Sequence, residues 1–305
     1  MRPVSYRLGL IGYPLEHSLS PALHQAALDA TRLHGEYHLY PIPPGPSRTY
    51  AIQELLGRMR IGEIHGLNVT VPLKQAVIPF MDRLTHAAQS VGAVNTIYLS
   101  DGGLVGENTD APGFWADLMR QHIPRKNSFA SALVLGAGGA ARAVVYALIQ
   151  AGWQVMVAAR RLEQAQELVA SLSQSVVGEV RPRPAQRTSG NRFGLQAARL
   201  RSDAMARVLP ADLALIVNAT PLGLFPQIYI SPWPFDLAFP KGAFVYDLVY
   251  NPAETPLMRQ ARQEGLPTSN GLGMLVEQAA LAFECWTGMP APREAMRETI
   301  MEKQG

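Results

Sequence analysis

A glycine-rich turn in the middle of the chain constrains the fold more than any other feature of the sequence. The apolar segment 133–135 runs directly into the sequence GAGGAA at 136–141, and a helical pattern follows. In such a strand–turn–helix unit, the first glycine permits the tight turn, the second lets the backbone approach a pyrophosphate, and Ala141 keeps the helix close to the strand. The sequence therefore predicts a dinucleotide-binding unit whose helix N-terminus faces the phosphates, preceded by enough chain for another domain.

Composition limits the class of protein. The chain has 305 residues, of which 48% are hydrophobic and 17% charged, as in a folded protein large enough for two domains. The single cysteine, Cys285, cannot form an internal disulfide and favours a reducing compartment. No apolar run is long enough for a membrane span, and the first residues do not resemble a signal peptide. We expect a cytoplasmic protein without a membrane partner.

The positive charge is concentrated in one segment, residues 174–207. It holds seven arginines and two acids, so it carries +5 while the rest of the chain carries −2. It has few apolar residues and no clear periodicity, which predicts a surface insertion, although a weak contact with a polyanion stays open. The charge therefore does not indicate a nucleic-acid partner.

Hydrophobic periodicity predicts strands that alternate with helices along the whole chain. In the first half, strands are expected at 7–12, 37–41, 65–71, 94–99 and 104–107, and helices from Ser20, at 52–59, at 74–83 and near Ala87. In the second half, strands are expected at 132–135, 155–158, 213–219 and 244–248, and helices at 140–151, 162–172, 256–264 and 274–286. Ser20 is the expected N-cap of its helix, with Pro21 in the first turn. The pattern predicts an α/β fold with mostly parallel sheets.

Two arginines indicate which dinucleotide the turn binds. An NAD site usually has an acidic residue at the end of the second strand, where it binds the ribose 2′-hydroxyl. This chain has Ala159, Arg160 and Arg161 there. Two guanidinium groups suit a 2′-phosphate, so NADP is favoured over NAD; the alternative is that both arginines simply begin a surface helix.

The first half of the chain carries candidate catalytic groups. Asn68, Thr70 and Lys74 lie near the carboxyl end of a predicted strand, where ligands bind in open α/β sheets. Asp110 lies in the segment that joins the two halves. Single Lys or Asp residues in loops are usually only solvated. A Lys and an Asp beside a nucleotide site could supply the proton that ketone reduction by hydride requires.

Eight segments resemble the shikimate dehydrogenase family, in the family's order and along almost the whole chain. They are SLSP at 18–21, NVTVPLK at 68–74, GAVNT at 92–96, NTD at 108–110, GAGGA at 136–140, NATP at 218–221, DLVY at 247–250 and GLGML at 271–275 with Gln278. The resemblance implies NADPH-dependent reduction of 3-dehydroshikimate to shikimate, a step toward chorismate and the aromatic amino acids.

The resemblance also implies an architecture and a set of roles. An α/β substrate domain, residues 1–112 and 271–305, would accompany a Rossmann-type NADP-binding domain at 113–270. Lys74 and Asp110 would be catalytic, although the sequence does not determine which is the formal proton donor. The implied substrate ligands are Ser18, Ser20, Asn68, Thr70, Asn95, Asp110, Tyr250 and Gln278. The implied cofactor surface is Gly136, Ala137, Gly138, Gly139, Ala140, Arg160, Arg161, Thr220, Leu248 and Gly271. No metal is implied.

The chain departs from the family at one cofactor position, where Ala159-Arg160-Arg161 replaces the family's usual Asn-Arg-Thr. Three alternatives stay open: a quinate dehydrogenase, another oxidoreductase with a Rossmann-type half, and a regulator that binds NADPH without turnover. The sequence does not determine the oligomeric state, and a homodimer is one state consistent with it.

Overall fold

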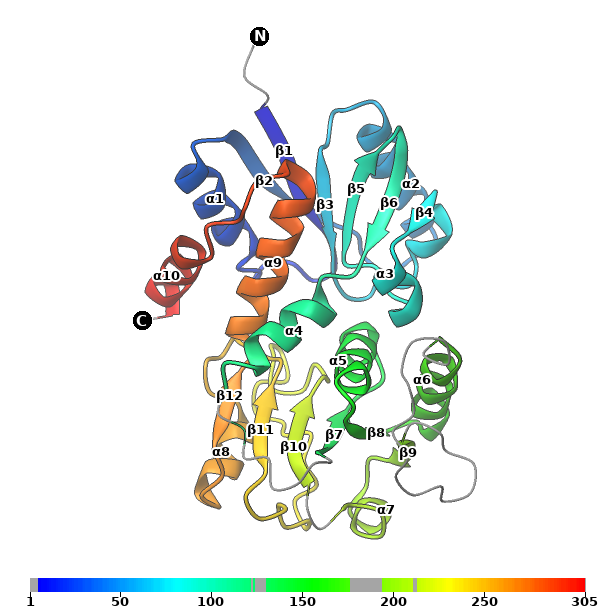
Figure 1. Cartoon of the computed structure of the whole chain (residues 1–305), viewed down its shortest axis with the longest axis vertical. Coiled ribbons are helices and arrows are strands. Elements are labelled where there is room, and N and C mark those ends of the chain that lie inside the picture. Colours follow the sequence, from blue (N-terminus) through cyan, green and yellow to red (C-terminus); the bar gives the residue numbers. More distant parts are fainter. Residues whose placement is uncertain (1–4, 122, 124–129, 176–193, 211–212, 305) are drawn as a thin grey trace. The chain divides into compact units, whose positions relative to one another are not determined.

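The chain folds into two compact units (Figure 1). The computed structural model describes all residues except 1–4, 122, 124–129, 176–193, 211–212 and 305. Unit 1 consists of residues 1–113 and 275–305, and unit 2 of residues 114–274. Helices α4 (Asp110–Leu118) and α9 (Leu272–Thr287) each begin in one unit and end in the other.

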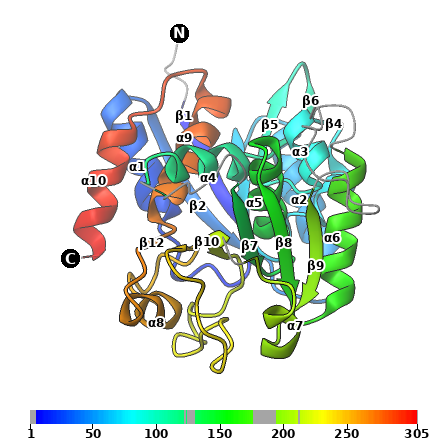
Figure 2. The ribbon, with the colours of Figure 1, turned by 60° about the horizontal axis from the view of Figure 1, so that its bottom comes forward.

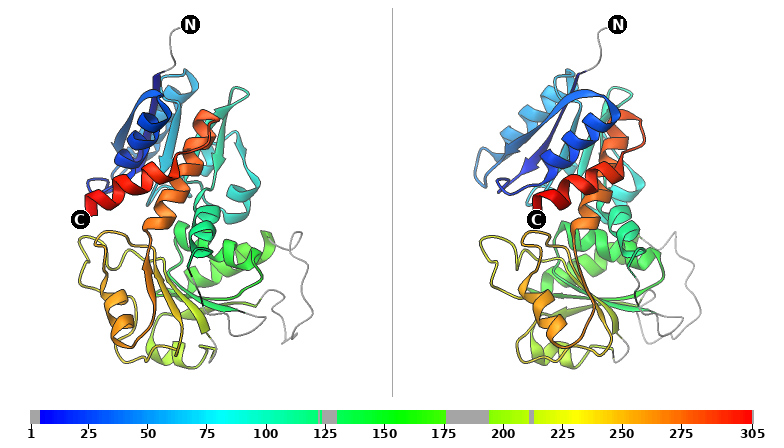
Figure 3. Two further views of the ribbon diagram at one scale, coloured as in Figure 1. Left: turned by 60° about the vertical axis from the view of Figure 1, so that its left-hand side comes forward. Right: turned by 90° about the vertical axis from the view of Figure 1, so that its left-hand side faces the viewer.

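Unit 1 contains a mixed six-stranded sheet of order β2-β1-β3-β5-β6-β4. Strands β1, β2 and β3 are parallel, whereas β5 is antiparallel to both β3 and β6. The strands are β1 (Ser5–Gly12), β2 (His34–Pro41), β3 (Gly66–Val69), β4 (Arg83–Leu84), β5 (Thr96–Ser100) and β6 (Gly103–Glu107). The helices are α1 (Ser20–Thr31), α2 (Arg48–Arg60), the 3₁₀ turn η1 (Ile78–Phe80), α3 (His86–Val91), most of α9, and α10 (Arg293–Gln304), which lies beside α1 in Figure 3.

Both faces of the sheet of unit 1 are covered. Successive side chains of β1 point to opposite sides of the sheet, and each side packs into its own hydrophobic cluster. Ile11 packs into a cluster that contains Ile52 of α2, whereas Leu8 and Leu10 pack into another that contains Trp286 of α9. The Trp286 indole lies over Gly66, where a Cβ would collide with the ring, and its Nε1 donates to the backbone oxygen of Ile97 at 3.1 Å. Helix α9 is thereby fixed to the sheet of unit 1.

Unit 2 contains a six-stranded parallel sheet of order β12-β11-β10-β7-β8-β9, part of which is seen side by side in Figure 2. This is the order of a doubly wound dinucleotide-binding fold, so the predicted α/β class is confirmed. Its strands are β7 (Ser131–Leu135), β8 (Gln154–Ala159), β9 (Leu195–Arg199), β10 (Leu213–Asn218), β11 (Phe244–Asp247) and β12 (Thr268–Asn270). Its helices are α5 (Gly139–Gln150), α6 (Leu162–Ser175), α7 (Ser202–Ala206) and α8 (Pro256–Gln263), with part of α4.

Three local predictions are wrong. The expected helix at 74–83 is a turn that leads into the short 3₁₀ helix η1 and then β4, because Pro79 has no amide hydrogen with which to continue an α-helix. Ser20 is the first residue of α1 and not its N-cap, because the N-cap position is occupied by Leu19.

The third correction concerns the predicted surface insertion at 174–207. Residues 195–199 form β9, which pairs with β8, and residues 202–206 form α7. Leu195 and Ala198 are buried, Gln196 and Arg199 are exposed, and β9 is the edge strand of this sheet. Residues 176–193, with four of the seven arginines, lie outside the described residues.

Trp286→Ala should lower the free energy of unfolding by about 3–5 kcal/mol, because it removes a large buried side chain and leaves a cavity over Gly66. Urea unfolding followed by far-UV circular dichroism measures the change. Tyr50→Ala is the matched control, since this aromatic ring is 70% exposed and its loss should change stability by no more than about 0.5 kcal/mol. Equal losses in the two variants would contradict the packing described.

Candidate active site

An ion pair between Lys74 and Asp110 lies at the centre of the candidate site in unit 1. The Nζ atom of Lys74 donates to Oδ2 of Asp110 at 2.5 Å, and the two side chains are 13% and 5% exposed. Asp110 is the first residue of α4, where the helix dipole favours a carboxylate. The structure thus brings together the two residues that the sequence singled out for acid–base chemistry.

The Asp110 carboxylate is held from its other side by Asn95. The Nδ2 atom of Asn95 donates to Oδ1 of Asp110 and to Oγ1 of Thr109, both at 2.9 Å, while its Oδ1 accepts from the Thr109 amide at 2.7 Å. The side chain of Asn108, two residues before this helix, caps its first turn, since its Oδ1 accepts from the Ala111 amide at 3.1 Å. Each oxygen of the buried carboxylate therefore has its own donor.

Lys74 is positioned by a turn and not by a helix. Leu73 and Val77, on either side of it, are fully buried. The backbone oxygen of Lys74 accepts from the Val94 amide at 2.8 Å, which ties this turn to the segment that carries Asn95. The backbone of Lys74 is therefore anchored on both sides of the residue, and its side chain is held by Asp110.

The structure places further predicted substrate ligands of unit 1 at α1, after β3 and on α9. Ser18 and Ser20 open α1, and Oγ of Ser18 lies 3.3 Å from the Ser20 amide. Thr70 follows β3, and its amide donates to the Ile11 oxygen at 2.9 Å. Gln278 of α9 directs Oε1 toward Asn95 Nδ2 at 3.5 Å, and its Nε2 donates to the Leu275 oxygen at 2.8 Å.

Asn68 has two partners that sequence reasoning missed, His24 and Tyr37. The Oδ1 atom of Asn68 lies 3.1 Å from Nε2 of His24 and accepts from the Tyr37 hydroxyl at 2.8 Å. The two rings are stacked, with centroids 4.5 Å apart. The sequence could have indicated His24, because it follows Ser20 by about one turn of the same helix and therefore lies on the same helix face.

The glycine turn of unit 2 fits a pyrophosphate. Gly136 has φ +110°, and a Cβ there would meet the Ala219 oxygen at 3.0 Å, so glycine is required. Gly138 is exposed with open space around its α-carbon, and no side chain caps the first amides of α5. These amides are available to a phosphate at the favourable end of the helix dipole. Gly136, Ala137, Gly138, Gly139 and Ala140 therefore form a suitable cradle.

A buried polar pair shapes the neighbouring loops of unit 2, and sequence reasoning assigned it no role. Asn218 ends β10, Asp247 ends β11, and Nδ2 of Asn218 donates to Oδ1 of Asp247 at 2.8 Å. Asn218 also accepts from the amide and hydroxyl of Thr220, while Asp247 accepts from the Val249 amide and the Thr255 hydroxyl. Burial raises the pKa of Asp247 to about 6. The pair fixes the backbone around the predicted cofactor residues Thr220 and Leu248.

The remaining predicted cofactor residues also belong to unit 2. A Cβ on Gly271 would collide with the backbone carbonyl of Leu248, so these two segments need a glycine to approach each other. Arg160 and Arg161 follow β8 and are both exposed. Tyr250, predicted to bind substrate, is a half-buried residue of the segment after β11 and therefore belongs to unit 2.

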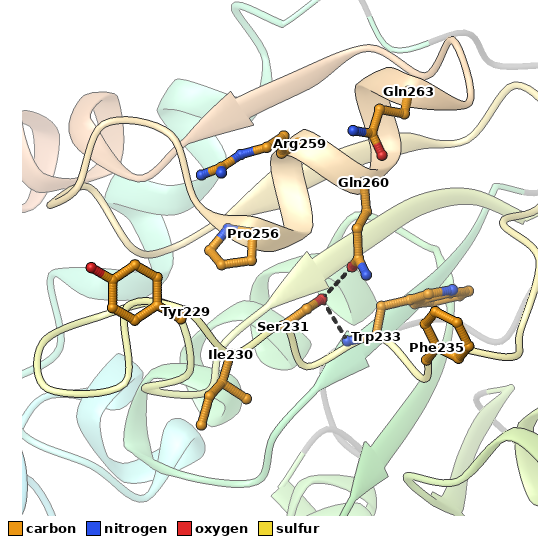
Figure 4. Close-up of a pocket in the computed structure, with 9 residues that line it drawn as sticks. All are labelled: Tyr229, Ile230, Ser231, Trp233, Phe235, Pro256, Arg259, Gln260 and Gln263. Atoms are coloured by element: carbon orange, nitrogen blue, oxygen red, sulfur yellow. Dashed lines mark hydrogen bonds between the residues drawn. The ribbon is translucent and has the colours of Figure 1, made fainter.

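A separate hollow of about 440 Å³ in unit 2 contains none of the predicted residues (Figure 4). It lies between the segment 229–235 and α8, where Oγ of Ser231 donates to Gln260 at 2.6 Å. Arg259 is its only charged lining residue. It offers no acid–base pair for redox chemistry.

Among the described residues, no helix is long and apolar enough to cross a membrane, and no group of three or more His, Cys, Asp or Glu is placed to bind a metal.

Comparison with known proteins identifies the family. Residues 10–97 match the shikimate dehydrogenase substrate binding domain, and residues 271–301 match the shikimate 5′-dehydrogenase C-terminal domain. The shikimate dehydrogenase (NADP(+)) of Symbiobacterium thermophilum is 38% identical over 96% of this chain and 93% of its own length. The chain belongs to the shikimate dehydrogenase family.

Solved structures of family members agree with this assignment. The shikimate 5-dehydrogenase of Thermus thermophilus in complex with NADP(H) and shikimate is 37% identical, with a TM-score of 0.77 over 97% of this chain and 99% of that one. The quinate dehydrogenase of Corynebacterium glutamicum in complex with NAD is 31% identical, with a TM-score of 0.81 over 98% of this chain and 99% of that one. The fold is therefore shared by family members with different substrates and cofactors.

The stability of this family member should depend on pH through His24. Complete burial lowers the pKa of His24 to about 3, whereas the ordinary value is 6.5. Between these values the folded protein binds fewer protons than the unfolded chain, so stability is fully present above pH 6.5 and is lost as the pH falls toward 3. Between pH 7 and pH 5, the wild type should lose about 2 kcal/mol more of its unfolding free energy than His24→Phe.

Urea denaturation of both proteins at each pH measures this difference, because all other titrating groups are common to the two. Parallel losses would show that His24 is protonated as readily in the folded protein as in the unfolded chain.

Proposed function

We propose that the chain catalyses the reversible NADPH-dependent reduction of 3-dehydroshikimate to shikimate, a step toward chorismate and the aromatic amino acids. The observation that carries this proposal is the buried Lys74–Asp110 pair, 2.5 Å apart, in a member of this family. A ketone that accepts a hydride develops negative charge on its oxygen and needs a proton donor beside it. Lys74 has such a proton, and Asp110 orients it.

The roles of the other residues follow from their chemistry. Ser18 and Ser20 offer hydroxyl groups at the start of α1, where the helix dipole favours the substrate carboxylate. Thr70, Asn95, Gln278 and Asp110 would bind ring hydroxyls, with Asn68 nearby. Tyr250, a residue of unit 2, stays a predicted substrate ligand. Lys74 gives its proton to the C3 oxygen during reduction and takes it back during oxidation.

The glycine turn and the arginine pair support NADP(H) as the cofactor. When bound, NADPH supplies the hydride. The amides of 136–140 would hold the pyrophosphate, Arg160 and Arg161 the 2′-phosphate, and Thr220, Leu248 and Gly271 the remaining surface. The expected location is the cytoplasm, and a homodimer is the assembly to be tested by light scattering.

A quinate dehydrogenase is the second candidate, because the chain is also similar to the quinate dehydrogenase of Corynebacterium glutamicum. Absorbance at 340 nm with shikimate or quinate, each with NADP⁺ or NAD⁺, separates the candidates. We expect the highest kcat/KM for shikimate with NADP⁺. Preference for quinate would favour the second candidate, and no turnover of any combination would favour a regulator that only binds the nucleotide.

Lys74→Ala should lower kcat by roughly 10²–10⁴ with a smaller change in KM, because it removes the proton donor and not the main binding contacts. The matched control is Lys303→Ala, which removes an exposed lysine of α10 and should leave kcat unchanged. A kcat near that of the wild type in Lys74→Ala would exclude Lys74 as the donor.

The double variant Arg160→Gln, Arg161→Gln should raise KM for NADP⁺ by roughly 10- to 100-fold, the size expected for lost charge-assisted hydrogen bonds. KM for NAD⁺ is the internal control and should change little, since NAD⁺ has no 2′-phosphate. An equal rise in KM for both nucleotides would show that the two arginines do not bind the 2′-phosphate.

A further inference from the structure

The amide of Asn68 can adopt only one orientation in unit 1. Its Nδ2 lies 3.3 Å from the backbone oxygen of Asn95 and 3.3 Å from Oγ1 of Thr96. A backbone oxygen can only accept, so the amino group of Asn68 must face this pair and its Oδ1 must face His24 and Tyr37. Both rings are then required to donate to the same oxygen.

This requirement fixes the tautomer of His24. The ring is completely buried, and the pKa near 3 keeps it neutral at ordinary pH. A neutral imidazole has one N–H, which must be on Nε2 to donate to Asn68. In the described part of the chain, Nδ1 has no hydrogen-bond partner, as expected for the nitrogen that carries no proton.

The hydrogen bonds continue from Asn68 to the catalytic pair within the same unit. Asn68 donates to the backbone of Asn95, and the side chain of Asn95 donates to Asp110, which binds Lys74. Thr96 runs beside this path, since its Oγ1 accepts from Asn68 and lies 3.3 Å from both Asn95 Oδ1 and Thr109 Oγ1. Every link joins atoms that are buried or nearly so.

We infer that His24 and Tyr37 are positioning residues for the reaction: by donating to Asn68, they orient the amide that holds the Asn95 segment against Asp110. If one donor is lost, fewer hydrogen bonds hold the amide in this orientation, and the Asn95 segment is held less firmly. Neither ring needs to touch the substrate for this role. The inference rests on the proposed function, because kcat is one of its two readouts.

The first experiment compares two substitutions of His24. His24→Gln keeps an N–H donor at the end of the side chain, whereas His24→Phe keeps the stacking ring and removes the donor. We expect kcat of His24→Phe to fall about 10-fold, the size of one well-placed buried hydrogen bond, and His24→Gln to restore at least half of that loss on a logarithmic scale. If the ring served only to fill the core, Phe would preserve kcat better than Gln.

Tyr37→Phe removes the second donor to the same oxygen and should also lower kcat. In an Asn68→Ala background, His24→Phe should have no further effect on kcat, because the residue through which it acts is gone. Far-UV circular dichroism and NADPH titration of each variant give the folded fraction used to correct kcat. A full His24→Phe effect in that background would overturn the inference.

The second experiment is independent of catalysis. Nitrogen–proton correlation NMR of the full chain with ¹⁵N-labelled histidine, with His24→Phe to assign the signal, identifies which ring nitrogen carries the proton at pH 7. The inference requires the Nε2–H tautomer. An Nδ1–H tautomer or a charged ring would overturn it even if the enzyme is active, and an Nε2–H tautomer in a protein without shikimate turnover would count against the proposed function alone.

Discussion

The structure of the candidate site depends on one buried carboxylate. Asp110 is 5% exposed, and a charge at this depth is stable only when its oxygens have donors. Lys74 supplies one donor and Asn95 the other. Removing either partner would leave an uncompensated charge or lone pair, so the surrounding loops are constrained to bring all three residues together.

The elements of unit 1 can be understood as supports for this arrangement. Strand β3 ends just before the turn that carries Lys74, and Asn95 precedes β5, the next strand in the sheet. The Asn108 side chain caps the first turn of α4, in which Asp110 lies. Trp286 packs over Gly66 at the start of β3. Packing and polar contacts therefore act on the same strand from opposite ends.

Much of the architecture was predictable from the sequence because its signals are local. The GAGGA turn lies between a strand and a helix as expected, and the apolar strands of both sheets were found to within a few residues. The errors lie where tertiary contacts override local pattern. β9 is a strand because β8 pairs with it, and 74–83 is no helix because of Pro79 and the pairing of β4 with β6.

The same division applies to the site. Lys74 and Asp110 were identifiable because their residue types fit the chemistry and their segments match a family, and their pairing in unit 1 is a finding of the structure. His24, Tyr37 and the Asn218–Asp247 pair were not identified, because a buried hydrogen bond between distant segments leaves no periodic trace in the sequence. A role that depends on a partner far along the chain can be identified only from the three-dimensional structure.

The central claim is that Lys74 and Asp110 act as one unit, and a double-mutant cycle on kcat tests it most directly. Residues that act as a unit have strongly non-additive effects, so Lys74→Met, Asp110→Asn and the double variant should have losses of similar size. A double variant whose loss equals the product of the two single losses would show that the residues act independently and would contradict this account.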